Sequence, residues 1–596
     1  MIQISKINDK EHVSTPPFSI LYFEIHTASS FYNIGNDQNP VREISVRYRQ
    51  ELEILFEGSE ESIITDFCKY VQAKDPDILI CINSHFERKN ILFERMNALG
   101  LDLPLGRDGS SSNRTKRIRG RVYLSNDFIR KELDLAGLIE RGRFSFLPLG
   151  QASRYGINRL IDSRNCYELI QMGFVFPGSF QYEHEPIRTI EEIITKDKGG
   201  MIFSPQIGLH ENVVVLDYEN EYANLILRHN LSYETEKETI VQNEKGLLPT
   251  IIEKVLDRRM LFKNLQKKFA INTDEWDLCE QRSLALKGIL VCLYGTTGSL
   301  SNRLANVTAF EEINRLSREV LIKTKDIVQA HGFKLVYADT DSVFLKKNGA
   351  SLKDFECVKN TLTRETGLPM SLEHNYKFLV LLPLEADHRM EALKHYFGIT
   401  HAGELIARGI EIRRHDSPNL IKGFQTELLY TMFDCNDLAE VFSKGYENAL
   451  LLVTRTIDKV MTGEIEMQDL VVPKLLRQDI DKYRNLFPHV SAAILLREAG
   501  KSLARGDNVQ YVYTDAQHKN PFCRVTPLGL MKQGEQEEQK YDKEKYREML
   551  LDAAETILGY FGFDRTAFGD PVKKRNRKWW YVLREERHRD IENERM

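Results

Sequence analysis

Short apolar runs alternate with helix-patterned stretches in the first part of the chain. Residues 18–27 and 77–83 are rich in the apolar side chains typical of strands. Between and after them, residues 61–74 and 87–99 carry the spacing of apolar positions found in helices. This alternation predicts an α/β domain that ends near residue 175, followed by a polar connector over residues 180–198.

Two later apolar runs lead into acidic residues. Residues 213–216 end at Asp217, and residues 333–336 and 343–345 flank Asp339-Thr340-Asp341 as the two strands of a hairpin. Carboxylates at adjacent strand ends suit hard divalent cations, which prefer oxygen ligands. Two such ions roughly 4 Å apart can stabilise both the attacking and the leaving oxygen of phosphoryl transfer. The alternative is a plain polar turn, since Asp favours turns.

Two helices are predicted between these acid-bearing strands, over residues 250–270 and 277–298, with a polar turn at 272–274. Arg259 and Lys263 are four residues apart and share a face of the first helix, whereas Lys287 and Tyr294 share a face of the second. Cations converging from two helices suit a triphosphate; the alternative is a pair of solvated basic helices. From about residue 390 the chain becomes increasingly helical, with a strong helix over 543–561.

Composition limits the remaining possibilities. The 596 residues are 42% hydrophobic and 28% charged, as in ordinary soluble globular proteins with several domains. No apolar run is long enough to span a bilayer and no signal peptide is evident, so we expect an intracellular, cytoplasmic and nucleoid-associated protein without a membrane partner. The eight cysteines form no C-x-x-C pair, which argues against a disulfide framework or a zinc site.

The net charge of -5 means that a polyanion would have to bind at local basic patches. One candidate is the basic run 573–578, which Trp579 and Trp580 follow, because cations and aromatic rings together bind nucleic-acid strands. The alternative for this run is solvated surface.

Five collinear motifs resemble those of family B DNA polymerases, in particular an archaeal branch with an inactivated exonuclease. Residues 217–224 resemble motif A (D-x-x-S-L-Y-P-S), 287–295 motif B (K-x-x-x-N-S-x-Y-G) and 339–342 motif C (D-T-D-S). Residues 394–398 resemble the start of the family's thumb, and 408–416 its duplex-gripping motif. The resemblance implies a multidomain fold of α/β and α+β type, a right-hand polymerase behind a ribonuclease H-like exonuclease domain.

The implied domain boundaries follow the motifs. They are a degenerate 3′-5′ exonuclease-like domain over 1–178, palm over 179–245 and 301–388, fingers over 246–300 and thumb over 389–596. The family's N-terminal uracil-sensing domain and a C-terminal clamp-binding peptide are expected to be absent.

The resemblance also assigns roles to individual residues. The catalytic acids would be Asp217, Asp341 and the less central Asp339; Asp217, the carbonyl of Tyr218 and Asp341 would bind two Mg²⁺ ions, with Mn²⁺ as the alternative. Nucleotide contacts would come from the steric gate Tyr222, the cations Arg259, Lys263 and Lys287, and Tyr294 beneath the nascent base pair. Phosphates of the primer–template would contact Lys394, Tyr396, Arg408, Arg413 and Arg414, and such contacts position a duplex without reading its sequence.

The chain departs from the family in two places. The first exonuclease motif, D-x-E in the family, has Glu24 and His26 here; the second has Glu87 in place of its Asp; the third keeps Asp162 but has Asn158 in place of a tyrosine. Each Asp-to-Glu change moves a carboxylate by one methylene, and His26 offers nitrogen where Mg²⁺ prefers oxygen. The nucleotide pocket differs at Asn220, Glu221, Ala223, Asn224, Val291 and Cys292.

The departures shape the expected function. We expect a DNA polymerase that uses dNTPs and primer–template DNA, lacks proofreading and tolerates mismatches or lesions, in replication or repair. Whether a sliding clamp or accessory subunit assists stays open. The alternative is a weakly active or inactive DNA-binding scaffold derived from a polymerase.

Overall fold

The structure is a computed structural model, and it describes residues 14–27, 40–48, 53–82, 91–109, 118–125, 135–175, 187–196, 199–234, 245–299, 301–384, 387, 389–499, 503, 505–531 and 541–569. The chain divides into two compact units. The first is Met1–Gly200 with Asn220–Val320, and the second is Met201–Glu219 with Leu321–Met596. Across the described ranges, no helix is long and apolar enough to cross a membrane.

A five-stranded sheet opens the first unit, in the order β3-β2-β1-β4-β5. Its strands are β1 (Ile20–Thr27), β2 (Val41–Tyr48), β3 (Ile54–Glu57), β4 (Ile78–Cys81) and β5 (Val122–Ser125). Strand β1 pairs antiparallel with β2 and parallel with β4. Alternate residues Leu21, Phe23 and Ile25 are buried in one core with side chains of α2 (Glu60–Lys74) and α3 (Ile91–Ala98). The predicted strands near 18–27 and 77–83 and the helix near 61–74 are confirmed.

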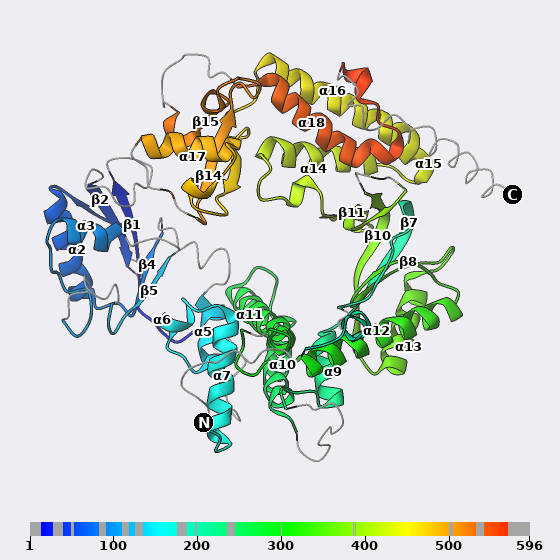
Figure 1. Ribbon diagram of the computed structural model, residues 1–596, viewed down its shortest axis with the longest axis horizontal. Helices are drawn as coiled ribbons and strands as arrows, with labels where there is room; N and C mark the ends of the chain where they lie inside the picture. Colours follow the sequence, from blue (N-terminus) through cyan, green and yellow to red (C-terminus); the bar gives the residue numbers. More distant parts are fainter. Residues whose placement is uncertain are drawn as a thin grey trace. The chain divides into compact units, whose positions relative to one another are not determined.

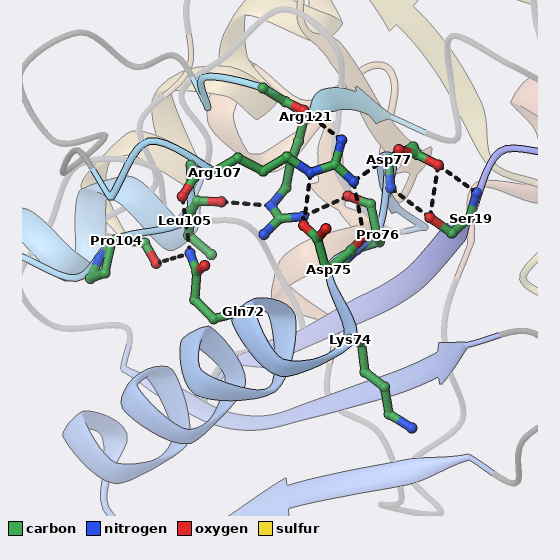
Figure 2. A network of polar contacts seen from close by, with 12 residues as sticks. Ser19, Gln72, Lys74, Asp75, Pro76, Asp77, Pro104, Leu105, Arg107 and Arg121 are labelled. Atoms are coloured by element: carbon green, nitrogen blue, oxygen red, sulfur yellow. Dashed lines mark hydrogen bonds and ion pairs between the residues drawn. The ribbon is translucent and has the colours of Figure 1, made fainter.

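A network of ion pairs joins the end of α2 to the starts of three strands (Figure 2). Arg107 pairs with Asp75 at 2.7 Å and with Asp77 at 2.9 Å, while Arg121 donates to both Asp75 and the carbonyl of Pro76. Asp77 in turn accepts the backbone N–H of Ser19 at 2.9 Å. The Ser19 N–H and Arg107 hold the pKa of Asp77 below its usual range, and Arg107 and Arg121 do the same for Asp75.

Helices make up the rest of the first unit. They are α5 (Leu135–Ser145), α6 (Leu149–Ala152), α7 (Ile157–Gln171), α8 (Ile190–Lys196), α9 (Glu221–His229), α10 (Leu247–Gln266), α11 (Asp274–Thr297) and the first part of α12 (Val307–Ala330). Helices α10 and α11 pack side by side, and α11 also packs against α5 and α7 (Figure 1). The two helices predicted over 250–270 and 277–298 are confirmed. Thr273 caps α11 by accepting the N–H of Trp276.

Within the polar connector predicted over 180–198, residues 190–196 form helix α8, which has no buried residue. A capping box starts this helix: the Thr189 hydroxyl accepts the N–H of Glu192 at 3.1 Å, and the Glu192 carboxylate accepts the N–H of Thr189 at 3.0 Å. The T-x-x-E pattern at Thr189–Glu192 is a signal for a helix start, but the polar composition of the segment favoured a connector.

A seven-stranded antiparallel sheet forms the centre of the second unit, in the order β12-β11-β10-β7-β9-β8-β6. The strands are β6 (Ile202–Phe203), β7 (Gly208–Tyr218), β8 (Lys334–Asp339), β9 (Ser342–Lys346), β10 (Met370–Pro383), β11 (Glu391–Thr400) and β12 (Leu405–Arg408). Residues 213–216 of the central strand β7 are all buried, and α13 (Leu352–Thr366) packs on β10. The predicted hairpin around residues 339–341 is therefore confirmed as β8–β9.

The C-terminal part of the second unit is mainly helical. Its elements are α14 (Asn419–Phe433), α15 (Leu438–Glu440), α16 (Tyr446–Thr462), α17 (Pro488–Glu498) and α18 (Lys543–Leu558), with a small sheet of β13 (Val472–Leu475), β14 (Asn508–Tyr513) and β15 (Val525–Pro527). Helices α14, α16 and α18 pack together over an apolar core (Figure 1). The strong helix predicted over 543–561 is confirmed.

Candidate active site

Two acid-bearing strand ends lie side by side in the seven-stranded sheet. In the β7–β9 pair Asp217 is opposite Ser342, and the backbone N–H of Tyr218 donates to the carbonyl of Asp341 at 2.9 Å. Asp217 and Asp341 are both half-buried. The structure thus brings together the segments that the sequence predicted as neighbours.

The turn between β8 and β9 holds a strained residue. Thr340 has a φ of 60°, a left-handed conformation that is rare for a β-branched side chain. Its N–H donates to the carbonyl of Met201 at 3.0 Å, and its hydroxyl donates to Asp339 at 3.2 Å. Strain of this kind costs about 1–3 kcal/mol and is concentrated at functional sites. The turn that carries Asp341 therefore belongs with the candidate site.

Asp339 is engaged by its neighbours. Its carboxylate pairs with the ammonium of Lys394 at 3.2 Å and accepts the hydroxyl of Tyr337 at 3.4 Å. Burial raises the pKa of Tyr337, and the nearby Asp339 carboxylate adds to that rise. A carboxylate held by a cation and two hydroxyls agrees with a supporting rather than a central role for Asp339.

Three aromatic rings stack in the first unit. The ring centres of Tyr222 and Tyr294 lie 4.1 Å apart, with an interplanar angle of 2°. The ring of Phe310 stacks on that of Tyr294, with ring centres 5.2 Å apart. The Tyr294 hydroxyl donates to Asn314 at 2.7 Å. Burial raises the pKa of Tyr294, against the opposing effect of its bonds to Asn314 and Tyr222. Phe310 and Asn314 were missed in the sequence, although their spacing of four places them on one face of α12.

The three cations of α10 and α11 have different surroundings. Arg259 is only 7% exposed and donates a hydrogen bond to the side-chain oxygen of Asn220, whereas Lys263 is half-buried and Lys287 is exposed. Asn220 precedes α9 with a left-handed φ of 54°. Glu221 is buried in the first turn of α9, where a helix N-terminus favours negative charge.

The residues expected to contact primer–template phosphates lie on or beside β11 and β12. Tyr396 is opposite Arg408 in that strand pair, and burial raises the pKa of Tyr396 while Arg408 opposes the rise. Arg413 is exposed, and Arg414 pairs with Asp416 at 3.0 Å. The exposed Arg408 and Arg413 therefore lie near this edge of the sheet together with the acid-paired Arg414.

Gly409, which directly follows β12, has a backbone conformation and surroundings that require glycine. Gly409 has a φ of 74°, and a Cβ at this position would lie 2.5 Å from the ring of His395 and 2.7 Å from the carbonyl of Lys394. Only glycine fits both the conformation and the close approach.

The described positions that the sequence compares with the family's exonuclease motifs lie on β1 and α7. Glu24 is half-buried opposite Ser45, and the exposed ring of His26 lies 3.8 Å from the Glu43 carboxylate. Asp162 pairs with Arg303 at 3.1 Å. Glu87 lies outside the described residues, as do the basic run 573–578 and the two tryptophans that follow it.

The strand-end acids carry carboxylate oxygens, the ligand type that hard divalent ions prefer. No group of three or more His, Cys, Asp or Glu side chains in the described part of the chain is arranged to hold a metal ion. The pair Asp217 and Asp341 with the carbonyl of Tyr218 is a set of two side chains and one backbone oxygen, and all three are oxygen donors suited to Mg²⁺.

Comparisons with known proteins agree with this picture. The sequence model of DNA polymerase family B matches residues 167–244 and 236–559. A DNA polymerase of Archaeoglobus fulgidus is 24% identical, with 94% of this chain and 79% of that protein covered. DNA polymerase 2 of Aeropyrum pernix is 23% identical, with coverages of 91% and 74%. The fold is similar to that of the family B DNA polymerase from Pyrobaculum calidifontis, with a TM-score of 0.67 at 21% identity, over 92% of this chain and 79% of the other.

Proposed function

Because the chain belongs to DNA polymerase family B, we propose that it is a template-directed DNA polymerase that adds dNTPs to a primer 3′-hydroxyl. The observation that carries the proposal is the register of β7 against β9, which sets Asp217 opposite Ser342 and joins Tyr218 to Asp341 by a backbone hydrogen bond. This register supports a joint role for the two acids as ligands of divalent ions.

The proposed chemistry is an in-line transfer of a nucleotidyl group. Two Mg²⁺ ions, when bound, lower the pKa of the primer hydroxyl and neutralise the leaving pyrophosphate. Asp217 and Asp341 hold the charge that keeps such ions in place, and Asp339 keeps Lys394 beside the strand end. Lys263 and Lys287, with Arg259, counter the charge of the triphosphate. The Tyr222 ring would act as a steric gate that excludes a ribose 2′-hydroxyl.

The domain roles are part of the proposal. Residues 179–245 and 301–388 would be the palm, 246–300 the fingers, 389–596 the thumb and 1–178 an exonuclease-like domain. The seven-stranded sheet supports the palm assignment because both acid-bearing strands lie in it. Primer–template DNA would contact the cations at the edge formed by β11 and β12.

Reduced proofreading is proposed on two observations. His26 offers a nitrogen where hard ions prefer oxygen, and the Asp162 carboxylate is already paired with Arg303. An exonuclease site built on these positions would hold Mg²⁺ poorly, so mismatched primer ends would persist and be extended. The test compares matched and mismatched 5′-labelled primers, with and without dNTPs. Rapid shortening of the mismatched primer would contradict the proposal.

Primer extension tests the polymerase assignment itself. Asp341→Asn keeps the shape of the side chain but removes its charge, so extension should fall by at least about 10³-fold, since metal ions supply several kcal/mol of stabilisation. Asp458→Asn, an exposed change on α16, is the matched control and should extend like the wild type. Primer–template binding without any extension by the wild type would favour the inactive-scaffold alternative.

A further inference from the structure

A buried carboxylate joins the N-terminal region to both helices that carry the proposed nucleotide cations. Glu140 of α5 is fully buried, and its two oxygens accept hydrogen bonds from Arg258 of α10 and Arg282 of α11. The second bond from Arg258 measures 2.9 Å. One side chain of α5 thus contacts α10 and α11 at once.

An aromatic ring completes this cluster. The guanidinium groups of Arg258 and Arg282 lie 5.0 Å and 5.4 Å from the centre of the Phe262 ring, which is fully buried. Arg282 is itself only 1% exposed and also donates to the carbonyl of Ser14 at 3.1 Å. Two cations, one anion and one ring therefore fix the mutual orientation of three helices.

The charge of Glu140 persists despite its burial. Burial alone would raise the pKa of its carboxyl, but the bond to Arg258 and the charges of Arg258, Arg282 and Arg143 hold the pKa below the usual range. Buried ion clusters of this kind are often no more stable than the apolar side chains that could replace them. The main effect of such a cluster is thus to fix the relative orientation of α5, α10 and α11 rather than to stabilise the fold.

The residues that bind Glu140 are close in sequence to the three cations proposed to bind the triphosphate. Arg258 precedes Arg259, and Phe262 precedes Lys263 on the same helix. Arg282 lies on α11, five residues before Lys287. A rotation or shift of either helix that broke the bonds to Glu140 would also displace these cations.

We propose that Glu140 is a positioning residue for dNTP binding, through which helix α5 fixes α10 and α11. The inference rests on the proposed function, because it assumes that Arg259, Lys263 and Lys287 bind the triphosphate. It gives the N-terminal region a role in synthesis that is independent of nuclease chemistry. Proofreading can be lost while α5 is retained, because the fold and the site are separable.

The test compares two buried ion pairs of the same unit. Glu140→Gln removes the negative charge at the centre of the cluster. Arg258→Gln is a milder second variant, because the Arg258 side chain is 29% exposed and the substitution leaves the bond between Arg282 and Glu140 in place. Glu60→Gln is the matched control: Glu60 forms a bidentate pair with Arg95 at 2.7 and 2.8 Å, with both side chains nearly buried, in the core of α2 and α3. Steady-state extension gives KM for dNTP and kcat, and amide hydrogen exchange reports α10 and α11 directly.

Glu140→Gln should raise KM for dNTP about tenfold, less than the 10²-fold that a misplacement of about 1 Å can cost, with a smaller change in kcat. Arg258→Gln should act in the same direction. Both variants should speed exchange in α10 and α11, and Glu60→Gln should do neither. Unchanged KM, or an equal rise in Glu60→Gln, would overturn the positioning role. Wild-type protein that extends no primer would instead refute the proposed function, and unchanged exchange in Glu140→Gln would then still refute the coupling of the helices.

Discussion

The ring stack of Tyr222, Tyr294 and Phe310 makes a quantitative prediction about sugar selection. If Tyr222 is the steric gate, its ring must be held in one plane, and the stack on Tyr294 holds it there. Phe310 in turn stacks on Tyr294, with ring centres 5.2 Å apart. An aromatic pair contributes about 0.5–1.5 kcal/mol beyond its buried area. Loss of the Phe310 ring should therefore lower the population of the stacked gate by about 2- to 12-fold.

Two substitutions test this at different atoms. Phe310→Leu removes the supporting ring, and Gly298→Ala forces it to move, because a Cβ at Gly298 would lie 2.6 Å from the ring of Phe310. Each should lower the ratio of kcat/KM for dNTP over rNTP by about 2- to 12-fold, whereas Tyr222→Ala should remove most of the discrimination. Phe310→Tyr keeps the ring and should behave like the wild type.

Tyr167→Leu is the matched control, since Tyr167 stacks on Phe146 at 3.9 Å in the same unit. It should cost stability without changing sugar discrimination. The reasoning is refuted if Tyr222→Ala relaxes sugar selection while Phe310→Leu and Gly298→Ala leave it unchanged.

The remaining predictions concern stability. Asp75 and Asp77 have lowered pKa values in the folded state, so their contribution is complete above the unfolded value of about 3.9 and is lost as the pH falls through the lower folded values. The difference in Tm between wild type and Asp77→Asn should be constant from about pH 5 to pH 7 and should shrink below about pH 4; a constant difference down to pH 3 in thermal scans would contradict the network's role. Gly409→Ala should lower the free energy of unfolding by at least about 1 kcal/mol, because the new Cβ meets His395 and the left-handed backbone is unfavourable. Denaturant titration checks this, with Gly403→Ala as the control for a left-handed glycine in open space.

Local patterns predicted the elements that carry the acids. The apolar run at 213–216 and the two runs around 339–341 were enough to place Asp217 and Asp341 at strand ends, since burial on a central strand requires continuous apolar residues. The pairing of β7 with β9 joins residues more than a hundred positions apart, and local patterns alone do not specify such a register.

Long-range contacts explain what the sequence did not indicate. The i, i+4 spacing placed Arg259 and Lys263 on one face, but it could not show that Arg259 donates a hydrogen bond to Asn220, 39 positions earlier in the sequence. Glu140 belongs to no motif, and its role depends on its contacts with Arg258 of α10 and Arg282 of α11. Phe310 and Asn314 have no motif, because their role comes from the ring that they support.

Binding of Mn²⁺ measured by electron paramagnetic resonance tests the central claim most directly. With a dideoxy-terminated primer–template and the next dNTP, the wild type should bind two Mn²⁺ ions. Asp217→Asn and Asp341→Asn should each weaken that binding, because either change removes a carboxylate from the shared set. Wild-type Mn²⁺ binding and spectra in both variants would contradict the account.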